Sequence, residues 1–124
     1  MSDTHLKLGR TGEIAARMFY EMRGADILEQ NWRCPFGEVD LIVLDESCLV
    51  FCEVKTRKSL SSGSPEEQVT RKRQERYIRC AQCYSQTCKR DYSQVRFDVI
   101  AVYPHDERGG EIHFIPNAFG EEFS

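Results

Sequence analysis

The chain has 124 residues, of which 40% are hydrophobic and 30% charged, and its formal net charge is −3. Its length suits one domain, and its composition is ordinary for a soluble globular protein. No apolar stretch approaches the roughly 20 residues that span a bilayer, and residues 1–8 lack the apolar segment of a secretion signal. We therefore expect a single cytoplasmic domain over residues 1–124 that does not associate with a membrane.

The first element expected along the chain is a helix from Gly9 to Arg23, because its apolar residues follow helical spacing. The buried face is expected to consist of Ile14, Ala15, Met18, Phe19 and Met22. Gly24 follows at a position where glycine often ends a helix. Glu13 falls in the first turn, where the helix dipole favours a negative charge.

Three strands are expected next, at Ala25 to Cys34, Glu38 to Asp45 and Cys48 to Arg57. The connections between them are short and rich in turn residues, which indicates an antiparallel meander. The segment from Lys58 to Pro65 is rich in serine and glycine and therefore predicts a mobile surface loop.

A second helix is predicted from about Glu66 to Lys89, with a buried stripe that includes Val69, Tyr77, Ile78, Ala81 and Tyr84. Strands at Gln94 to Tyr103 and Glu111 to Ile115 follow. The core then covers about residues 8–116, and the tail at 117–124 is expected to be poorly ordered. One helix, three strands, a second helix and two strands predict an α/β or α+β fold with a mixed five-stranded sheet flanked by helices.

The six cysteines are expected to be reduced thiols, because no secretion signal is present. Cys80, Cys83 and Cys88 have offsets that fit one face of a helix, where cysteine packs as a small core residue. A zinc site there would need a fourth ligand from elsewhere in the chain. Cys48 and Cys52 lie on a predicted strand and are expected to pack.

Basic residues dominate the middle of the chain, between Lys55 and Arg90, whereas acids dominate after Arg96. Lys72, Arg76 and Arg79 share one face of the second predicted helix. This basic segment is a candidate surface for a polyanion. The alternative is a helix face that is simply solvated.

Acidic and basic residues end two of the predicted apolar strands. Glu53 and Lys55 point to one side of their strand and Val54 points to the other, while Asp40 lies in the preceding strand. Burial of such charges costs several kcal/mol per ion unless they are paired or bind a metal. Asp40, Glu53 and the carbonyl of Val54 would suit Mg²⁺ or Mn²⁺, and Lys55 could position a water. A surface ion pair is the alternative for an isolated Glu-x-Lys triplet.

The combination of several segments points to a known family. They are Gly12-Glu13, Asn31-x-Arg33, Gly37-Glu38-Val39-Asp40-Leu41-Ile42, Val50-Phe51-Cys52-Glu53-Val54-Lys55-x-Arg57 and Arg96-Phe97-Asp98-Val99. Together they resemble the bacterial YraN family of predicted endonucleases. That family is similar to the PD-(D/E)xK superfamily, which has the restriction-endonuclease-like fold, and to archaeal Holliday-junction resolvases. The resemblance covers roughly Leu8 to Pro116.

The resemblance implies a role for each matching residue. Asp40 matches the metal-binding aspartate, Glu53 the second acid and Lys55 the lysine of the motif, although Val39 stands where the motif has proline. Glu13 matches a first-helix glutamate that helps to complete the metal site, with a helix-dipole partner as the alternative. Gln68 and Lys72 match the start of the second helix, where related nucleases contact phosphate.

We therefore expect a metal-dependent endonuclease that hydrolyses DNA, with branched or recombination intermediates as candidate substrates. The residues expected to bind phosphates are Arg57, Lys58, Gln68, Lys72, Arg76 and Arg79. The alternatives are a non-catalytic nucleic-acid-binding module and a partner-binding module with the same fold. A homodimer is expected by analogy with the resolvases.

Overall fold

The computed structural model describes residues 3–56, 70–105 and 109–120. The elements follow one another in the order expected from the sequence, with two helices and five strands. They are α1 (Asp3–Met22), β1 (Asp26–Cys34), β2 (Gly37–Asp45), β3 (Cys48–Thr56), α2 (Arg71–Ser85), β4 (Gln94–His105) and β5 (Gly109–Phe119).

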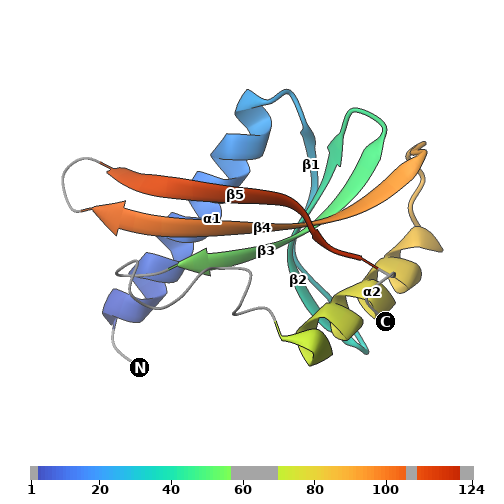
Figure 1. Cartoon of the computed structure of the whole chain (residues 1–124), viewed down its shortest axis with the longest axis horizontal. Coiled ribbons are helices and arrows are strands. Elements are labelled where there is room, and N and C mark those ends of the chain that lie inside the picture. Colours follow the sequence, from blue (N-terminus) through green and yellow to red (C-terminus); the bar gives the residue numbers. More distant parts are fainter. Residues whose placement is uncertain (1–2, 57–69, 106–108, 121–124) are drawn as a thin grey trace.

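The five strands form one mixed sheet in the order β1-β2-β3-β4-β5 (Figure 1). β1, β2 and β3 pair antiparallel, β3 and β4 pair parallel, and β4 and β5 pair antiparallel. The parallel pair follows from the long connection through α2, because adjacent parallel strands require a crossover. The predicted meander and the predicted mixed sheet in an α+β fold are therefore confirmed.

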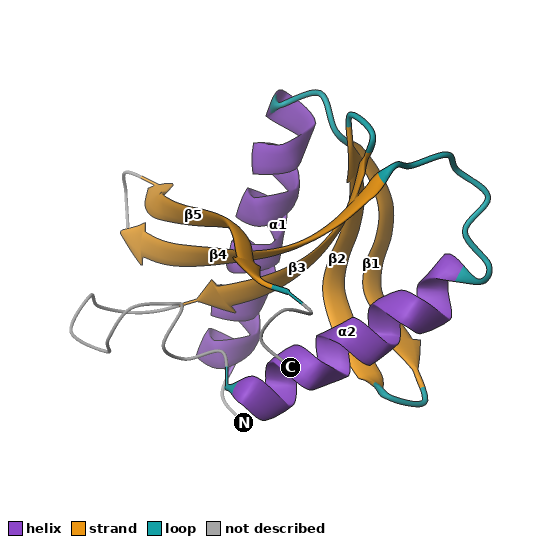
Figure 2. Ribbon diagram, turned by 45° about the vertical axis from the view of Figure 1, so that its right-hand side comes forward, coloured by secondary structure: helices purple, strands orange, loops and turns teal. Residues whose placement is uncertain are grey.

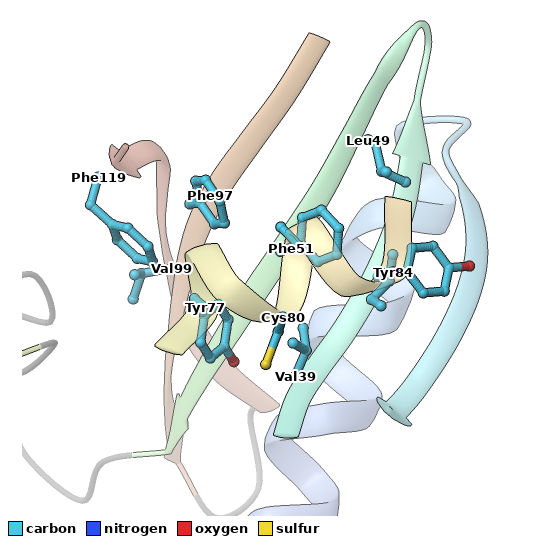
Figure 3. Close-up of a cluster of buried hydrophobic side chains, with 11 residues drawn as sticks. Val39, Leu49, Phe51, Tyr77, Cys80, Tyr84, Phe97, Val99 and Phe119 are labelled. Atoms are coloured by element: carbon cyan, nitrogen blue, oxygen red, sulfur yellow. The ribbon is translucent and has the colours of Figure 1, made fainter. Parts of the chain in front are cut away.

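The two helices cover opposite faces of the sheet (Figure 2). On one face, Ala16 and Tyr20 of α1 pack with Leu41, Val50 and Ile100 of the sheet. On the other face, the buried residues of α2 join an aromatic cluster that the sheet lines (Figure 3). These α2 residues are Tyr77, Cys80, Ala81 and Tyr84.

The predicted buried face of α1 is partly wrong. Ile14, Met18 and Met22 are 59%, 53% and 85% exposed, whereas Ala16 and Tyr20 are fully buried. Small residues let the helix lie close to the sheet: a methyl group added at Gly12 would overlap the side chain of Thr56. The positions of large apolar residues predicted the wrong side of α1, because the helix packs closely against the sheet through its small residues.

The remaining boundaries differ at element ends. α1 starts at Asp3 and not at Gly9, so Glu13 lies in the middle of the helix, and its expected place in the first turn is wrong. α2 is described from Arg71 to Ser85, capped by the Thr70 side chain, so Cys88 lies beyond the helix; Pro65 and Val69 lie outside the described residues. β5 continues past Pro116 to Phe119, so the expected loss of order from residue 117 is wrong for 117–119. Phe119 is 1% exposed and stacks on Phe97 with ring centroids 5.0 Å apart, which holds this end of the strand.

A buried ion cluster joins α1 to the far end of the sheet. Asp98 is fully buried and accepts hydrogen bonds from the Arg96 guanidinium, the Tyr20 hydroxyl and the backbone N–H of Asn117, at 2.8–2.9 Å. Arg96 also donates to Asp45 at 3.1 Å, and Arg23 donates to Asp45 at 2.9 Å. Burial alone would raise the pKa of Asp45, but the bonds from Arg23 and Arg96 bring it below its usual value. Each buried carboxylate here has partners.

None of the helices in the described residues has the length and apolar character needed to cross a membrane.

Candidate functional site

The candidate site lies where two paired strands separate. The ladder between β2 and β3 ends at Leu41 and Cys52, although β2 starts earlier and β3 continues to Thr56. Beyond that point β3 stays paired with β4 (Figure 1). We call this opening, between Asp40 of β2 and Glu53 and Val54 of β3, the fork. Backbone groups that face the fork lack a partner strand, so side chains supply their hydrogen bonds.

Asp40 fills the fork with its carboxylate. Its Oδ2 accepts a hydrogen bond of 2.8 Å from the backbone N–H of Val54, in place of a ladder bond. Burial, and next the negative charge of Glu53, raise the pKa of Asp40 to about 7, although the bond from Val54 opposes this. The charges of Glu13 and Glu38 add to the increase. Asp40 and Glu53 are thus close enough to repel each other.

Glu53 is the most buried acid at the fork, with 2% of the residue exposed. Its Oε1 lies 2.9 Å from Nη2 of Arg73 and 3.6 Å from Nζ of Lys55. Its other oxygen, Oε2, accepts no hydrogen bond from the described part of the chain. A buried carboxylate oxygen without a partner is unfavourable, and a cation or a hydrogen-bond donor would offset that cost.

Arg73 and Tyr77 are residues of α2 that contact the fork. Burial alone would lower the pKa of Arg73, but the charge of Glu53 and the bond to it raise the pKa above its usual value. The Tyr77 hydroxyl lies 3.4 Å from both the Asp40 nitrogen and the Cys52 oxygen. Its pKa is raised by burial and then by the charges of Asp40 and Glu53.

Glu13 reaches the same region from α1. Its Oε1 accepts a hydrogen bond of 2.9 Å from Nδ2 of Asn31 in β1. Asn31 has a positive φ of 49°, a conformation that asparagine tolerates better than most residues. Glu13 of α1 is therefore held by a side chain of β1, and its charge acts on Asp40.

A pocket of about 190 Å³ opens beside Asp40. Its walls come from the start of β2 and the first turns of α2, and its lining residues are Gly37, Glu38, Asp40, Arg73, Arg76 and Tyr77. Lys72, Arg76 and Arg79 are exposed on α2 as expected, and the Arg79 guanidinium lies 5.9 Å from the centre of the Phe36 ring. Arg57, Lys58 and Gln68 lie outside the described residues.

The structure thus brings Asp40, Glu53 and Lys55 together, whereas Glu13 bonds to Asn31 and is linked to Asp40 only through the effect of its charge on the Asp40 pKa. The N–H of Val54 points to Asp40, and a metal-binding role of its carbonyl stays a prediction. Among the described residues, no three Asp, Glu, His or Cys side chains lie close enough together to hold a metal ion. The candidate side-chain ligands at the fork are therefore the two acids, Asp40 and Glu53.

Sequence reasoning missed Arg73, Tyr77 and Asn31. Arg73 lies four residues after Val69 and four before Tyr77 in the predicted buried stripe, so a cation among apolar positions was the available signal, but its partner Glu53 depends on the tertiary fold. Tyr77 was expected only to pack, because its hydroxyl acquires partners only once α2 is placed against the fork. Asn31 lies in one of the segments that resemble the YraN family, but its bond to Glu13 depends on the tertiary fold.

Comparisons with known proteins agree on the family. A model of the uncharacterised protein family UPF0102 matches residues 12–102. A UPF0102 protein of Syntrophotalea carbinolica is 40% identical over 119 residues, covering 96% of both chains. A UPF0102 protein of Chlorobium phaeobacteroides is 43% identical over 117 residues, covering 90% of this chain and 93% of that one. One of Syntrophus aciditrophicus is 42% identical over 115 residues, covering 93% of this chain and 90% of that one.

The matched region contains the whole fork, from the glycine beside Glu13 to the strand that pairs with Glu53. UPF0102 is the YraN group, so the resemblance to that family is confirmed. The chain belongs to the UPF0102 family.

Proposed function

We propose that this protein is a metal-dependent endonuclease that hydrolyses phosphodiester bonds in DNA. The observation that carries the proposal is the pair of acids at the fork, Asp40 and Glu53, whose negative charges are only partly compensated. Glu53 is buried, one of its oxygens has no hydrogen-bond partner among the described residues, and its charge raises the pKa of the adjacent Asp40. A divalent cation would remove both penalties at once, because it supplies positive charge and accepts hard oxygen ligands.

The donor set fits Mg²⁺ or Mn²⁺ better than a softer metal, because it consists of carboxylates. Asp40 and Glu53 would hold the cation, with the Val54 carbonyl as a further ligand. When bound, such an ion neutralises charge on the phosphate and makes water more acidic. Lys55, whose ammonium already lies 3.6 Å from Glu53, would orient the attacking water and stabilise negative charge on the phosphate.

Arg73 has two roles in this proposal. Without a cation, its guanidinium neutralises Oε1 of Glu53 at 2.9 Å. A cation held by Glu53 would take over this neutralisation, and Arg73, which lines the pocket beside Arg76, would then be free to contact a phosphate. Two guanidiniums beside the acids suit the non-bridging oxygens of a phosphate, which they can bind bidentately.

The start of α2 strengthens the preference for a polyanion. Arg71, Lys72 and Arg73 occupy its first turn, which contains no acid. Cations are unfavourable at a helix N-terminus, because the helix dipole is positive there. A phosphate backbone along this end of α2 would reverse that repulsion, with Lys72 and Arg76 as phosphate contacts and Glu13 assisting from α1.

A cleavage panel tests the proposal. Linear, nicked, single-stranded and four-way DNA are incubated with the protein and Mg²⁺ or Mn²⁺. We expect cleavage that depends on the cation and falls by at least about 100-fold in Asp40→Asn and Glu53→Gln. Asp26→Asn and Glu111→Gln are matched controls, because both acids lie at exposed positions away from the fork. Cleavage that persists in the two fork variants would refute the assignment.

A non-catalytic nucleic-acid-binding module is the second candidate. The Arg73–Glu53 ion pair favours it, since it already neutralises one of the two acids. This candidate predicts salt-sensitive DNA binding that is unaffected by Asp40→Asn and no cleavage of any substrate. The same panel, combined with a binding titration, separates the two.

A further inference from the structure

Three thiols meet between β1 and α2. Cys34 is the last residue of β1, and Cys80 and Cys83 lie one turn apart in α2. The sulfurs of Cys34 and Cys80 are 3.3 Å apart, although the residues are 46 positions apart in the chain. Cys83 also contacts Cys34.

The short separation of these sulfurs suits a disulfide better than a shared metal. Two thiolates bound tetrahedrally to one zinc ion at about 2.3 Å would lie about 3.8 Å apart. A disulfide needs the sulfurs at about 2.05 Å, which is a small closing movement from 3.3 Å. We propose that Cys34 and Cys80 form a reversible disulfide that fixes α2 to the β1–β2 hairpin.

The difference in exposure between the two thiols sets the order of the reaction. Cys34 is partly exposed, whereas Cys80 is 1% exposed. The thiolate of Cys34 attacks a small-molecule disulfide, forms a mixed disulfide and releases one small thiol. Cys80 then loses its proton, attacks the sulfur of Cys34 and expels the second small thiol. Two protein thiols are oxidised, and one small disulfide is reduced to two thiols.

The second step is the slow one. Burial, followed by the neighbouring Cys34, raises the pKa of Cys80 to about 12. The attacking thiolate is therefore scarce at neutral pH, and the bridge forms faster as the pH rises.

The bridge would connect the two walls of the pocket. Gly37 lies three residues after Cys34, and a methyl group built on it would come within 4.0 Å of the Cys80 sulfur and 3.7 Å of Arg76 Cδ. Arg76 and Tyr77 line the pocket one turn before Cys80. A disulfide there holds α2 at a fixed distance from the start of β2. If the proposed function is correct, oxidation also hinders the release of Arg73 from Glu53.

Mass spectrometry of the oxidised full-length chain tests the proposal. The reduced protein is incubated with oxidised glutathione, and free thiols are then blocked with N-ethylmaleimide. We expect an intramolecular disulfide that links tryptic peptides 34–55 and 80–89 and two fewer maleimide adducts. Dithiothreitol should reverse both changes. Mixed disulfides alone, without the link, would overturn the proposal.

Variants are needed because each of these peptides contains further cysteines. Cys34→Ser and Cys80→Ser should abolish the link, with Cys80→Ala as a second variant that keeps the buried position apolar. Cys88→Ser is the matched control on the same peptide and should retain it. A bridge that persists in a folded Cys34→Ser or Cys80→Ala protein would overturn the assignment.

Thermal unfolding gives a second readout that involves neither nucleic acid nor metal, so it fails or succeeds independently of the nuclease proposal. Oxidation should raise the unfolding midpoint of the wild type by roughly 5–15 °C. The same treatment should leave the midpoint of Cys34→Ser unchanged. An unchanged midpoint for the cross-linked wild type would show that the bond does not clamp α2.

Discussion

Two groups of buried carboxylates in this molecule differ in how fully their oxygens are hydrogen-bonded and their charges paired. Asp98 is fully buried and receives hydrogen bonds from Arg96, Tyr20 and Asn117. Glu53 is nearly as buried, yet one of its oxygens has no partner in the described residues, and its charge raises the pKa of Asp40. The first group uses its charges to hold elements together. The second is only partly compensated, because Arg73 and Lys55 both approach Oε1 of Glu53 and the described residues give Oε2 no partner, which fits a place prepared for a ligand.

The largest expected effect on stability is at the complete cluster. Asp98→Asn removes the negative charge that pairs with Arg96 and replaces one accepting oxygen by an NH2 group that faces hydrogen-bond donors, so we expect a loss of about 3–5 kcal/mol in the free energy of unfolding. Urea denaturation measures it. Asp26→Asn, which removes an exposed ion pair with Arg90, should cost less than about 1 kcal/mol. Equal costs for the two variants would contradict the role given to Asp98.

Glu53→Gln should behave in the opposite way. It removes a charge from a site that lacks full compensation, so the free energy of unfolding should change by less than about 1 kcal/mol. Cleavage, in contrast, should fall at least about 100-fold, because a neutral amide is a poor ligand for Mg²⁺. Parallel urea curves and cleavage rates on one preparation provide the comparison. A large loss of stability would place Glu53 with Asp98 as a structural acid.

The fold could be predicted further than the site. Apolar spacing and turn residues located the strands from Glu38 to Asp45 and from Cys48 to Thr56 within a residue or two. The exposed face of α1 was misassigned because helix approach depends on Gly12 and Ala16, which carry little hydrophobic signal. The partners of Asp98 were unpredictable because Tyr20 lies 78 positions away in the sequence. Arg73 was missed for the same reason, since only the packing of α2 against the fork selects it.

Titration of Asp40 should give stability a distinctive pH dependence. Its pKa rises from the ordinary 3.8 to about 7 in the folded state, so the folded protein binds a proton more tightly than the unfolded chain does. Its contribution is fully present below pH 3.8 and is lost as the pH rises to about 7. Asp40→Asn should therefore gain stability relative to the wild type across this range. Denaturation at several pH values without metal checks this, and an unchanged difference would contradict the shifted pKa.

Arg73→Gln should give the smallest effect and the most specific one. The side chain of Arg73 is 44% exposed, so its loss should reduce stability only modestly. It also leaves Glu53 without its closest cation, so Mn²⁺ should raise the unfolding temperature more in this variant than in the wild type. Arg71→Gln, in the same turn of α2, is the matched control and should respond like the wild type. A smaller Mn²⁺ response in Arg73→Gln would show that Arg73 supports cation binding and does not substitute for it.

Calorimetric titration of the protein with Mn²⁺ in the absence of nucleic acid tests the central claim most directly. We predict binding of a single ion at the fork that is lost in both Asp40→Asn and Glu53→Gln and kept in Asp26→Asn. The affinity should increase with pH up to about 7, because Asp40 must lose its proton to bind the ion. Binding of equal affinity in the wild type and in both fork variants, or no binding by the folded wild type, would contradict the account.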